Sequence, residues 1–467
     1  MEDLIRAGAV ELTVRLARRE VQPAELLDAL AARIAAVDPQ VNALPTLCLD
    51  RARAVRPVAP LHGLPVAVKD LSETRGVRTT HGSPIFADHI PDADDHVVER
   101  IEATGGAIYA KSNTPEFGAG AQTFNAVFGI TRNPWNTALT PAGSSGGAAV
   151  ALKTGMAWLA HGSDLGGSLR NPASFCGIVG LRPSVGRVPK GPAPDPWGSL
   201  SVEGPMARSV ADVALFLDAL AGPDPREAIS LPAPATPFLA AAQAPRLPRR
   251  VAFSPDLGGL TPVDAEVAAL TEAAARRLER LGVAVEVSSP DFTGAHACFQ
   301  TLRALGFAVG HADKLRDHRE KLKDDVIWNT EKGLALTGAE VAEALRSRGV
   351  IMARARAFFE TYDLLLCPAT IVPPFPVEQR FVTECAGVRF ETYIDWLAIA
   401  YAITLTGHPA LSLPCGFTAA GLPVGLQMVG RWQDEAGLLS HAAALEVELA
   451  LDPAPIDPRP PAARSDR

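Results

Sequence analysis

Two short runs of glycine and serine, both within residues 141–170, constrain this chain more than any other feature of its sequence. The first run, residues 141–147, reads PAGSSGG, and the second, residues 162–170, reads GSDLGGSLR. Because glycine has no Cβ, the backbone N–H groups beside it can turn toward a bound oxygen atom. Two such loops close together in the chain predict a single site that combines hydroxyl groups with unengaged backbone amides.

A third feature lies upstream, where residues 64–70 read LPVAVKD. The apolar residues predict a short buried strand that ends at Lys69. Burial disfavours the charged ammonium and therefore lowers the pKa of a lysine. A neutral lysine can activate a serine hydroxyl as a nucleophile. Lys69 could also be an ordinary surface lysine at the end of an exposed strand, but the two serine loops favour the catalytic interpretation.

These three runs together resemble the amidase signature family, which consists of serine hydrolases that cleave carboxamides. The resemblance continues through residues 171–183, includes residues 111–117 and 133–135 upstream, and returns at residues 407–410 and 421–427. It is strongest over residues 60–210. The resemblance implies a single α/β domain in which helices flank both faces of a large mixed β-sheet.

The resemblance also assigns a role to each reactive side chain. It makes Ser168 the nucleophile and Lys69 the base, while Ser144, held on a cis peptide in this family, relays the proton between them. The implied oxyanion hole consists of the backbone N–H groups of four residues: Leu165, Gly166, Gly167 and Ser168. The implied acyl pocket opposite the nucleophile is lined by Gly118, Ala119, Gly120, Ala121 and Gln122.

The composition of that lining leads to an expectation about substrate size. Four of the five residues lack bulk, so we expect a roomy pocket that prefers bulky or aromatic acyl groups. A charged helical segment, residues 293–361, is expected to supply an apolar wall above it from Phe299, Leu302, Leu305, Phe307 and Trp328. Alternatively, the bulk of this segment fills the space and the pocket stays small.

Three residues beside the reactive serines are assigned supporting roles. Asp164 and Arg170 either contact substrate or form a buried ion pair that fixes the nucleophile loop, and we favour the ion pair. Ser145 fits a Gly-x-Ser-x-Gly nucleophile elbow over residues 143–147. That motif requires a strand directly before it, whereas residues 133–141 predict a loop, so Ser145 is expected to steady its loop by hydrogen bonding. At Ser163 the sequence departs from the family, in which threonine is frequent.

Other reactive side chains do not suggest a competing site. His81, His96 and His161 show no metal-ligand spacing, so no metal site is expected. Cys176 lies in an apolar segment, where the pKa of a thiol rises and its reactivity falls. The six cysteines are scattered singly along the chain, which predicts neither a zinc knuckle nor a disulfide framework.

Charge and hydropathy limit the classes of partner. The net charge of −8 is spread without blocks of like charge, which argues against nucleic acid or an anionic membrane surface as a partner. Residues 1–30 carry charges throughout, and no later run approaches the roughly 20 apolar residues of a membrane-spanning helix. We therefore expect a cytoplasmic protein that does not associate with membranes.

The helix and strand signals suggest how the chain is organised. Residues 1–60 are predicted to form an N-terminal helical segment that packs on a neighbouring surface or subunit, so a homodimer is one expected arrangement. Residues 61–450 form the main domain, which comprises a core at 61–222, a proline-rich linker at 223–248 and a helical cap insertion at 293–361. The proline-rich tail, residues 451–467, is predicted to be disordered.

The resemblance implies hydrolysis of a small-molecule carboxamide through a serine acyl-enzyme, without a metal or an organic cofactor. Aryl amides, esters and carbamates are expected as further substrates. The alternative is the amidase subunit of a glutamine-dependent aminoacyl-tRNA amidotransferase, which passes ammonia to a partner synthetase. A non-catalytic or nucleotide-binding protein is disfavoured because the lysine and both serines are intact.

Overall fold

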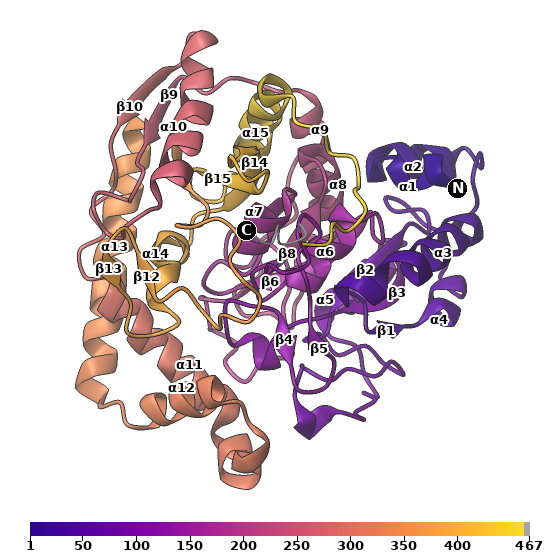
Figure 1. Ribbon diagram of the computed structural model, residues 1–467, viewed down its shortest axis with the longest axis horizontal. Helices are drawn as coiled ribbons and strands as arrows, with labels where there is room; N and C mark the ends of the chain where they lie inside the picture. The colour runs from indigo at the N-terminus through magenta and orange to yellow at the C-terminus, as the bar shows by residue number, and fades with distance from the viewer. Residues whose placement is uncertain (462–467) are drawn as a thin grey trace, which may run out of the picture.

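A mixed sheet of eleven strands runs through the computed structural model, which describes residues 1–461 (Figure 1). The strand order is β1-β3-β2-β6-β8-β7-β14-β15-β11-β9-β10. The strands are β1 (Thr46–Leu47), β2 (Pro65–Lys69), β3 (Ala107–Ser112), β6 (Leu159–Asp164), β7 (Val179–Arg182), β8 (Val202–Ala207), β9 (Arg250–Phe253), β10 (Ala284–Val287), β11 (Leu364–Pro368), β14 (Ala410–Phe417) and β15 (Pro423–Val429). The predicted α/β fold with a large mixed sheet is confirmed.

The helices are distributed over both faces of this sheet. They are α1 (Glu2–Arg6), α2 (Ala9–Ala17), α3 (Pro23–Val41), α4 (Leu49–Arg53), α5 (His96–Ala103), α6 (Gly146–Lys153), α7 (Arg170–Cys176), α8 (Val210–Leu220), α9 (Phe238–Gln243), α10 (Ala265–Arg280), α11 (Ala295–His318), α12 (Asp324–Leu334), α13 (Gly338–Thr361), α14 (Ala398–Thr406) and α15 (Glu435–Leu449). Two short hairpins, β4 (Phe124–Asn125) with β5 (Gly129–Ile130) and β12 (Glu384–Cys385) with β13 (Val388–Arg389), lie outside the main sheet.

Strand β11 illustrates how the two faces are buried. Successive side chains of a strand point to opposite faces of the sheet. Leu364 and Leu366 belong to the hydrophobic core that α3, α6, α8, α10 and α15 cover. Leu365 and Cys367 belong to a second core beneath α11, α13 and α14. A strand with both faces buried must be apolar at every position, and this is why β11 reads as a continuous apolar run.

Local signals in the sequence fix several helix starts. Pro23 occupies the first position of α3, where its missing N–H would have no partner within the helix. Ser209 caps α8, because its side-chain oxygen accepts a hydrogen bond from the backbone N–H of Asp212 at 3.2 Å. The N-terminal helices α1 and α2 pack on the same chain, where the indole N–H of Trp158 donates to the carbonyl of Leu4 at 3.1 Å.

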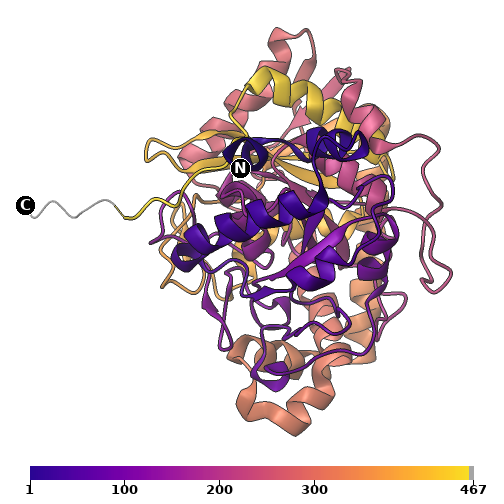
Figure 2. The same cartoon turned by 90° about the vertical axis from the view of Figure 1, so that its right-hand side faces the viewer.

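The segment 293–361 contains α11, α12 and α13, of which α11 and α12 lie at the lower left of Figure 1. In Figure 2 the salmon-coloured part of this segment lies at the bottom of the molecule, far from α15 at the top. Phe299 of α11 and Ile351 of α13 anchor the segment in the second hydrophobic core. Among residues 1–461, no helix combines the length and apolar character that crossing a membrane requires.

The disorder predicted for the tail is wrong over the part that the structure describes. The backbone N–H of Ile456 donates to the carbonyl of Lys153 at 2.8 Å, and the ammonium of Lys153 donates to the carbonyl of Ala454 at 3.0 Å. Arg459 exchanges two further backbone hydrogen bonds with residues 134 and 137. Long-range contacts of this kind are not encoded in local composition. Residues 462–467 of the predicted tail lie outside the described residues.

We predict that Gly180→Ala destabilises the fold by about 1–3 kcal/mol, because β7 packs so closely on residues 169–173 that no space is left for a side chain at position 180. A Cβ at Gly180 would lie 2.4 Å from the carbonyl oxygen of Leu169 and 2.9 Å from Cβ of Ala173. Chemical denaturation measures the loss. The matched control is Gly416→Ala on β14, whose Cβ would meet only Leu270 Cδ2 at 3.4 Å. Equal stability of the two variants would contradict the steric argument.

Candidate active site

Lys69 lies at the end of β2, in the interior of the sheet between β3 and β6, and its side chain is fully buried. Its ammonium nitrogen lies 2.7 Å from Oγ of Ser144, 2.9 Å from Oγ of Ser145 and 3.0 Å from Oγ of Ser163. None of these three partners carries a charge. The structure therefore surrounds the lysine with hydroxyl groups in place of a counter-ion.

Burial lowers the pKa of Lys69 to about 7, although the charges of Glu203 and Asp164 act in the opposite direction. An amine with this pKa is substantially neutral at physiological pH. A neutral amine has two N–H donors and one lone pair, which matches the three surrounding hydroxyl groups. It can therefore accept a proton from one serine while it donates hydrogen bonds to the other two.

The two serine loops contact each other beside the lysine. The first carries a cis peptide between Gly143 and Ser144 and leads into α6. The backbone N–H of Ser145 donates to the carbonyl of Ser168 at 3.3 Å, and Oγ of Ser145 donates to the carbonyl of Ser163 at the same distance. Ser144 and Ser168 line one cavity. Ser145 thus links the first loop both to the second loop and to β6.

The second loop, residues 165–169, connects β6 to α7 and presents backbone N–H groups to the cavity. The N–H of Gly167 donates to Oδ1 of Asp164 at 3.0 Å and is therefore engaged. Among the described residues, the N–H groups of Leu165, Gly166 and Ser168 make no hydrogen bond, and these three residues line the cavity. Three of the four residues predicted for the oxyanion hole thus have unengaged amides.

Only glycine fits at position 167, because of the backbone conformation there and the close packing around it. Its φ of +115° lies in the region that favours glycine. A Cβ there would lie 2.6 Å from Oδ1 of Asn171 and 2.7 Å from Cβ of Ala400. The turn that aims the neighbouring amides at the cavity consequently depends on the absence of a side chain at this position.

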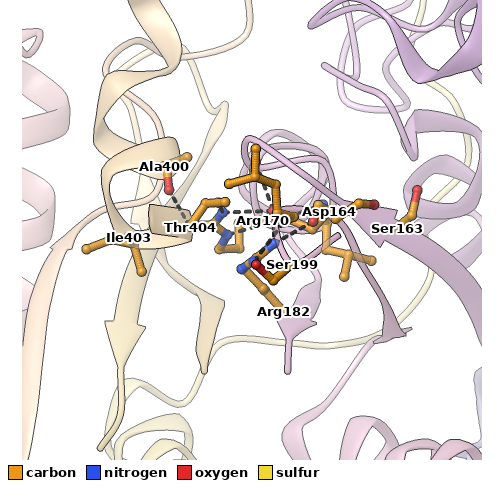
Figure 3. Close-up of polar contacts among 12 residues, drawn as sticks. Ser163, Asp164, Arg170, Arg182, Ser199, Ala400, Ile403 and Thr404 are labelled. Carbon is orange, nitrogen blue, oxygen red and sulfur yellow. Dashed lines mark hydrogen bonds and ion pairs between the residues drawn. The ribbon is translucent and has the colours of Figure 1, made fainter. Parts of the chain in front are cut away.

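Asp164 holds the second loop in place through two buried arginines (Figure 3). Its Oδ1 lies 2.8 Å from a terminal nitrogen of Arg170 and 3.2 Å from one of Arg182. Its Oδ2 accepts from the backbone N–H of Leu169 at 3.1 Å. Burial raises the pKa of Asp164, but the two guanidinium groups outweigh this effect and hold its pKa well below the usual range. The carboxylate is therefore charged.

Arg170 extends the network to the C-terminal part of the chain. Its guanidinium donates to the carbonyl of Ala400 at 2.8 Å and to Oγ1 of Thr404 at 3.1 Å, both on α14, as Figure 3 shows. Asp164 and Arg170 thus form a fully buried ion pair behind the loop.

The cavity beside Ser168 has a volume of about 120 Å³. Of the residues predicted to bind substrate, Gly118 and Gly120 lie in its wall. Ala119 and Ala121 instead pack into hydrophobic clusters, and the side-chain amide of Gln122 donates to the carbonyl of Gln379. The remaining wall includes Leu71, Phe117, Phe299, Arg303, Phe307, Tyr393 and Leu397.

Four residues of the site were not singled out as functional by the sequence analysis. Ser163 was noted only as a departure from the family, although its position directly before Asp164 in the second run is a usable signal. Glu203, whose carboxylate lies 2.8 Å from a ring nitrogen of His161, stands beside Ser163 on the neighbouring strand β8. Arg303 and Tyr393 come from distant segments that no motif marks.

Two residues for which the sequence predicts no catalytic role, Cys176 and His161, are buried in the structure. Cys176 is fully buried, and its burial raises the pKa of the thiol well above the usual range. His161 is also buried, with one ring nitrogen paired to Glu203. Among residues 1–461, no three His, Cys, Asp or Glu side chains are grouped so as to hold a metal ion.

Comparisons with known proteins agree on one family. A family model described as Amidase matches residues 25–439. The acylamidase of Rhodococcus erythropolis is 34% identical over 456 residues, with 94% of each chain covered. One subunit of the glutamyl-tRNA(Gln) amidotransferase of Thermus thermophilus is 38% identical over 467 residues, covering 94% of this chain and 96% of that protein. The structure of 6-aminohexanoate cyclic dimer hydrolase complexed with substrate superimposes with a TM-score of 0.88 at 28% identity, covering 97% of this chain and 99% of the other.

We predict that Asp164→Asn destabilises the protein by about 3–5 kcal/mol, because it leaves two buried guanidinium groups without their charge partner. Denaturant unfolding measures the change, and turnover should fall with it because the loop loses its anchor. The matched control is Asp313→Asn, which removes an exposed ion pair with Arg316 and should leave stability nearly unchanged. Near-native stability of Asp164→Asn would mean that the buried network does not hold the loop.

Proposed function

The chain belongs to the amidase family, and on that premise we propose that this amide hydrolase cleaves acyl amides through an acyl-enzyme formed on Ser168. One observation carries the proposal: a fully buried Lys69 lies 2.7 Å from Ser144, which shares a cavity with Ser168. A base, a relay hydroxyl and a nucleophile are thereby provided in sequence. Unengaged backbone amides border the same cavity and complete the requirements for acyl transfer.

In the acylation step, neutral Lys69 accepts the proton of Ser144 as Ser144 accepts the proton of Ser168. The Oγ of Ser168 then attacks the carbonyl carbon of the amide. The unengaged N–H groups of Leu165, Gly166 and Ser168 are the donors available to the developing oxyanion. When the C–N bond breaks, the proton returns through Ser144 to the departing nitrogen, so the leaving group departs as a neutral amine.

In the deacylation step, water replaces the amine and the same groups act again. The lysine accepts a proton from water through Ser144, and the resulting hydroxide equivalent attacks the ester carbonyl of the acyl-enzyme. Collapse of the second tetrahedral intermediate releases the carboxylic acid and returns the proton to Ser168. Every step uses groups that the chain itself supplies, and the lysine needs only to alternate between its two protonation states.

The substrate class that we favour is a small-molecule acyl amide, with aryl amides, esters and carbamates as further candidates. The likeness to an acylamidase supports this choice. The cavity of about 120 Å³ admits a compact acyl group beside Ser168, because Phe299 and Phe307 occupy part of the space opposite Gly118 and Gly120. Any bulkier portion of the substrate must then extend outward from the cavity.

A second candidate is the amidase subunit of a glutamine-dependent amidotransferase. The identity of 38% with such a subunit from Thermus thermophilus, over 94% of this chain, favours it specifically. The two candidates share their chemistry and differ in substrate and partner. Hydrolysis of simple acyl amides by the isolated chain supports the first candidate, whereas glutamine hydrolysis that requires a co-purifying synthetase subunit supports the second.

We predict that Ser168→Ala lowers kcat for an acyl amide by at least about 10⁴-fold while the circular dichroism spectrum stays native, because the nucleophilic oxygen is lost. A fluorophosphonate probe should label the wild-type chain at Ser168, as identified by mass spectrometry of the peptides. The Ser168→Ala variant is the control and should remain unlabelled. A label on Ser145 or on a cysteine would refute the assignment.

We also predict that kcat/KM rises with pH through a midpoint near 7, because Lys69 must be neutral to act as base and burial lowers its pKa to about 7. The charge of Glu203 raises this pKa, so Glu203→Gln should move the midpoint to lower pH. Glu360→Gln, which removes an exposed carboxylate, is the control and should leave the midpoint unchanged. A pH-independent rate, or an active Lys69→Ala variant, would exclude Lys69 as the base.

A further inference from the structure

The cavity beside Ser168 continues into a second, larger space, which we call the outer pocket. Its volume is about 460 Å³. Five residues line both spaces and mark the junction between them: Phe117, Leu165, Ser201, Arg303 and Phe307. A substrate with its scissile carbonyl at Ser168 can therefore extend past this junction. The outer wall comes mainly from residues 190–201 and from α11 of the segment 293–361, whose helix is labelled at the lower left of Figure 1.

Arg303 is a buried cation at this junction, with only 6% of its surface exposed. Its guanidinium donates to the hydroxyl of Tyr393 at 2.5 Å and to Oδ1 of Asn329. It also lies over the ring of Phe307, 4.3 Å from the ring centroid. A guanidinium has five N–H donors, and these protein contacts use only part of them.

Arg303 lacks a carboxylate partner among the described residues. The nearby carboxylates are engaged elsewhere: Asp325 pairs with Lys323 at 2.7 Å, and Asp395 accepts from the side-chain amide of Gln300 at 3.0 Å. Elsewhere in the interior, Arg170 shows the usual solution, since its charge is compensated by Asp164. A buried cation without compensation is costly, and a ligand that supplies the missing negative charge relieves that cost.

The outer pocket carries a second arginine without a carboxylate partner within residues 1–461, although its side chain is only half-buried. Arg348 of α13 donates to Oγ of Ser199 at 2.7 Å and to the carbonyl of Ser199 at 3.2 Å, and it forms no ion pair within residues 1–461. Lys190 adds a third cationic side chain to the wall, where the charges of Glu203, Glu227 and Asp195 act on it. The excess of positive charge in the wall therefore rests on the two arginines.

We propose that the outer pocket binds a carboxylate carried by the amide substrate, with Arg303 as the residue that recognises it. This inference rests on the proposed amide hydrolysis and specifies its substrate class: amides that bear a carboxylate several bonds away from the scissile carbonyl. A guanidinium matches the two oxygens of a carboxylate with parallel hydrogen bonds. The aromatic rings of Phe307 and Tyr393 keep its plane fixed and therefore pre-oriented for the ligand.

Two substrate pairs test the proposal, each comparing a carboxylate with a nitro group, which has the same shape without the charge. The first pair carries this group at the end of the acyl chain of an anilide, and the second carries it on the aryl ring of the leaving amine. The wild-type enzyme should prefer the carboxylate by about 10-fold or more in kcat/KM in at least one pair. No preference in either pair would overturn the proposal.

The Arg303→Gln variant locates the preference. We expect about 10-fold or greater loss in kcat/KM for the preferred carboxylate substrate, mainly through KM, and a much smaller loss for its nitro counterpart. Arg303→Lys should retain part of the preference because it keeps the charge. Arg346→Gln, an exposed arginine that pairs with Glu343 on α13, is the matched control and should change neither substrate. Equal losses for both members of a pair would indicate a merely structural arginine and contradict the proposal.

A binding measurement separates this inference from the proposed function. Calorimetric titration of the Ser168→Ala variant with glutarate and with its uncharged dimethyl ester requires no turnover and no substitution at Arg303. Tighter binding of glutarate, weakened by added salt, supports the carboxylate site even if the arginine variants fail to fold. Equal affinities would refute the site while leaving amide hydrolysis, measured on the nitro substrates, intact.

Discussion

The architecture of the site depends on keeping one lysine uncharged in the interior of the sheet. Lys69 stands on β2 between two neighbouring strands, where water cannot solvate an ammonium. Residues 1–461 supply three hydroxyl groups there and no carboxylate within ion-pair distance. Burial disfavours the charged ammonium, and hydroxyl groups supply no compensating negative charge, so burial lowers the pKa of the lysine. The first serine loop and strand β6 thus converge on the nitrogen that β2 carries.

Strand β6 carries a buried side chain that is charged, the carboxylate of Asp164. Ser163 turns toward Lys69, while Asp164, the next residue, turns toward Arg170 and Arg182 (Figure 3). Strand geometry sends successive side chains to opposite faces, so a single strand can contact the proposed base and carry a charged carboxylate without bringing the two together. The anchor also joins the nucleophile loop to α14, which is more than two hundred residues away in the chain. The position of the nucleophile is thereby linked to the C-terminal part of the sheet.

The segment 293–361 gives the site its substrate-facing surface. Phe299 and Phe307 limit the cavity beside Ser168, and Arg303, one helical turn from both, brings charge to its rim. Residues three to four positions apart lie on the same face of a helix, and this single face of α11 therefore combines apolar bulk with one cation. The proposed reactive groups come from the sheet and its loops, whereas the groups proposed to select a substrate come from the helices packed over them.

Much of this protein could be predicted from local sequence. The glycine-rich runs, the apolar strand ending in Lys69, the helix start at Pro23 and the cap at Ser209 are local signals, because backbone conformation depends on neighbouring residues. Other features depend on contacts between distant segments. The pKa of Lys69, the engagement of the Gly167 amide by Asp164, and the absence of a carboxylate beside Arg303 within residues 1–461 belong to this group. Burial and charge compensation are properties of packing, so only the tertiary structure decides them.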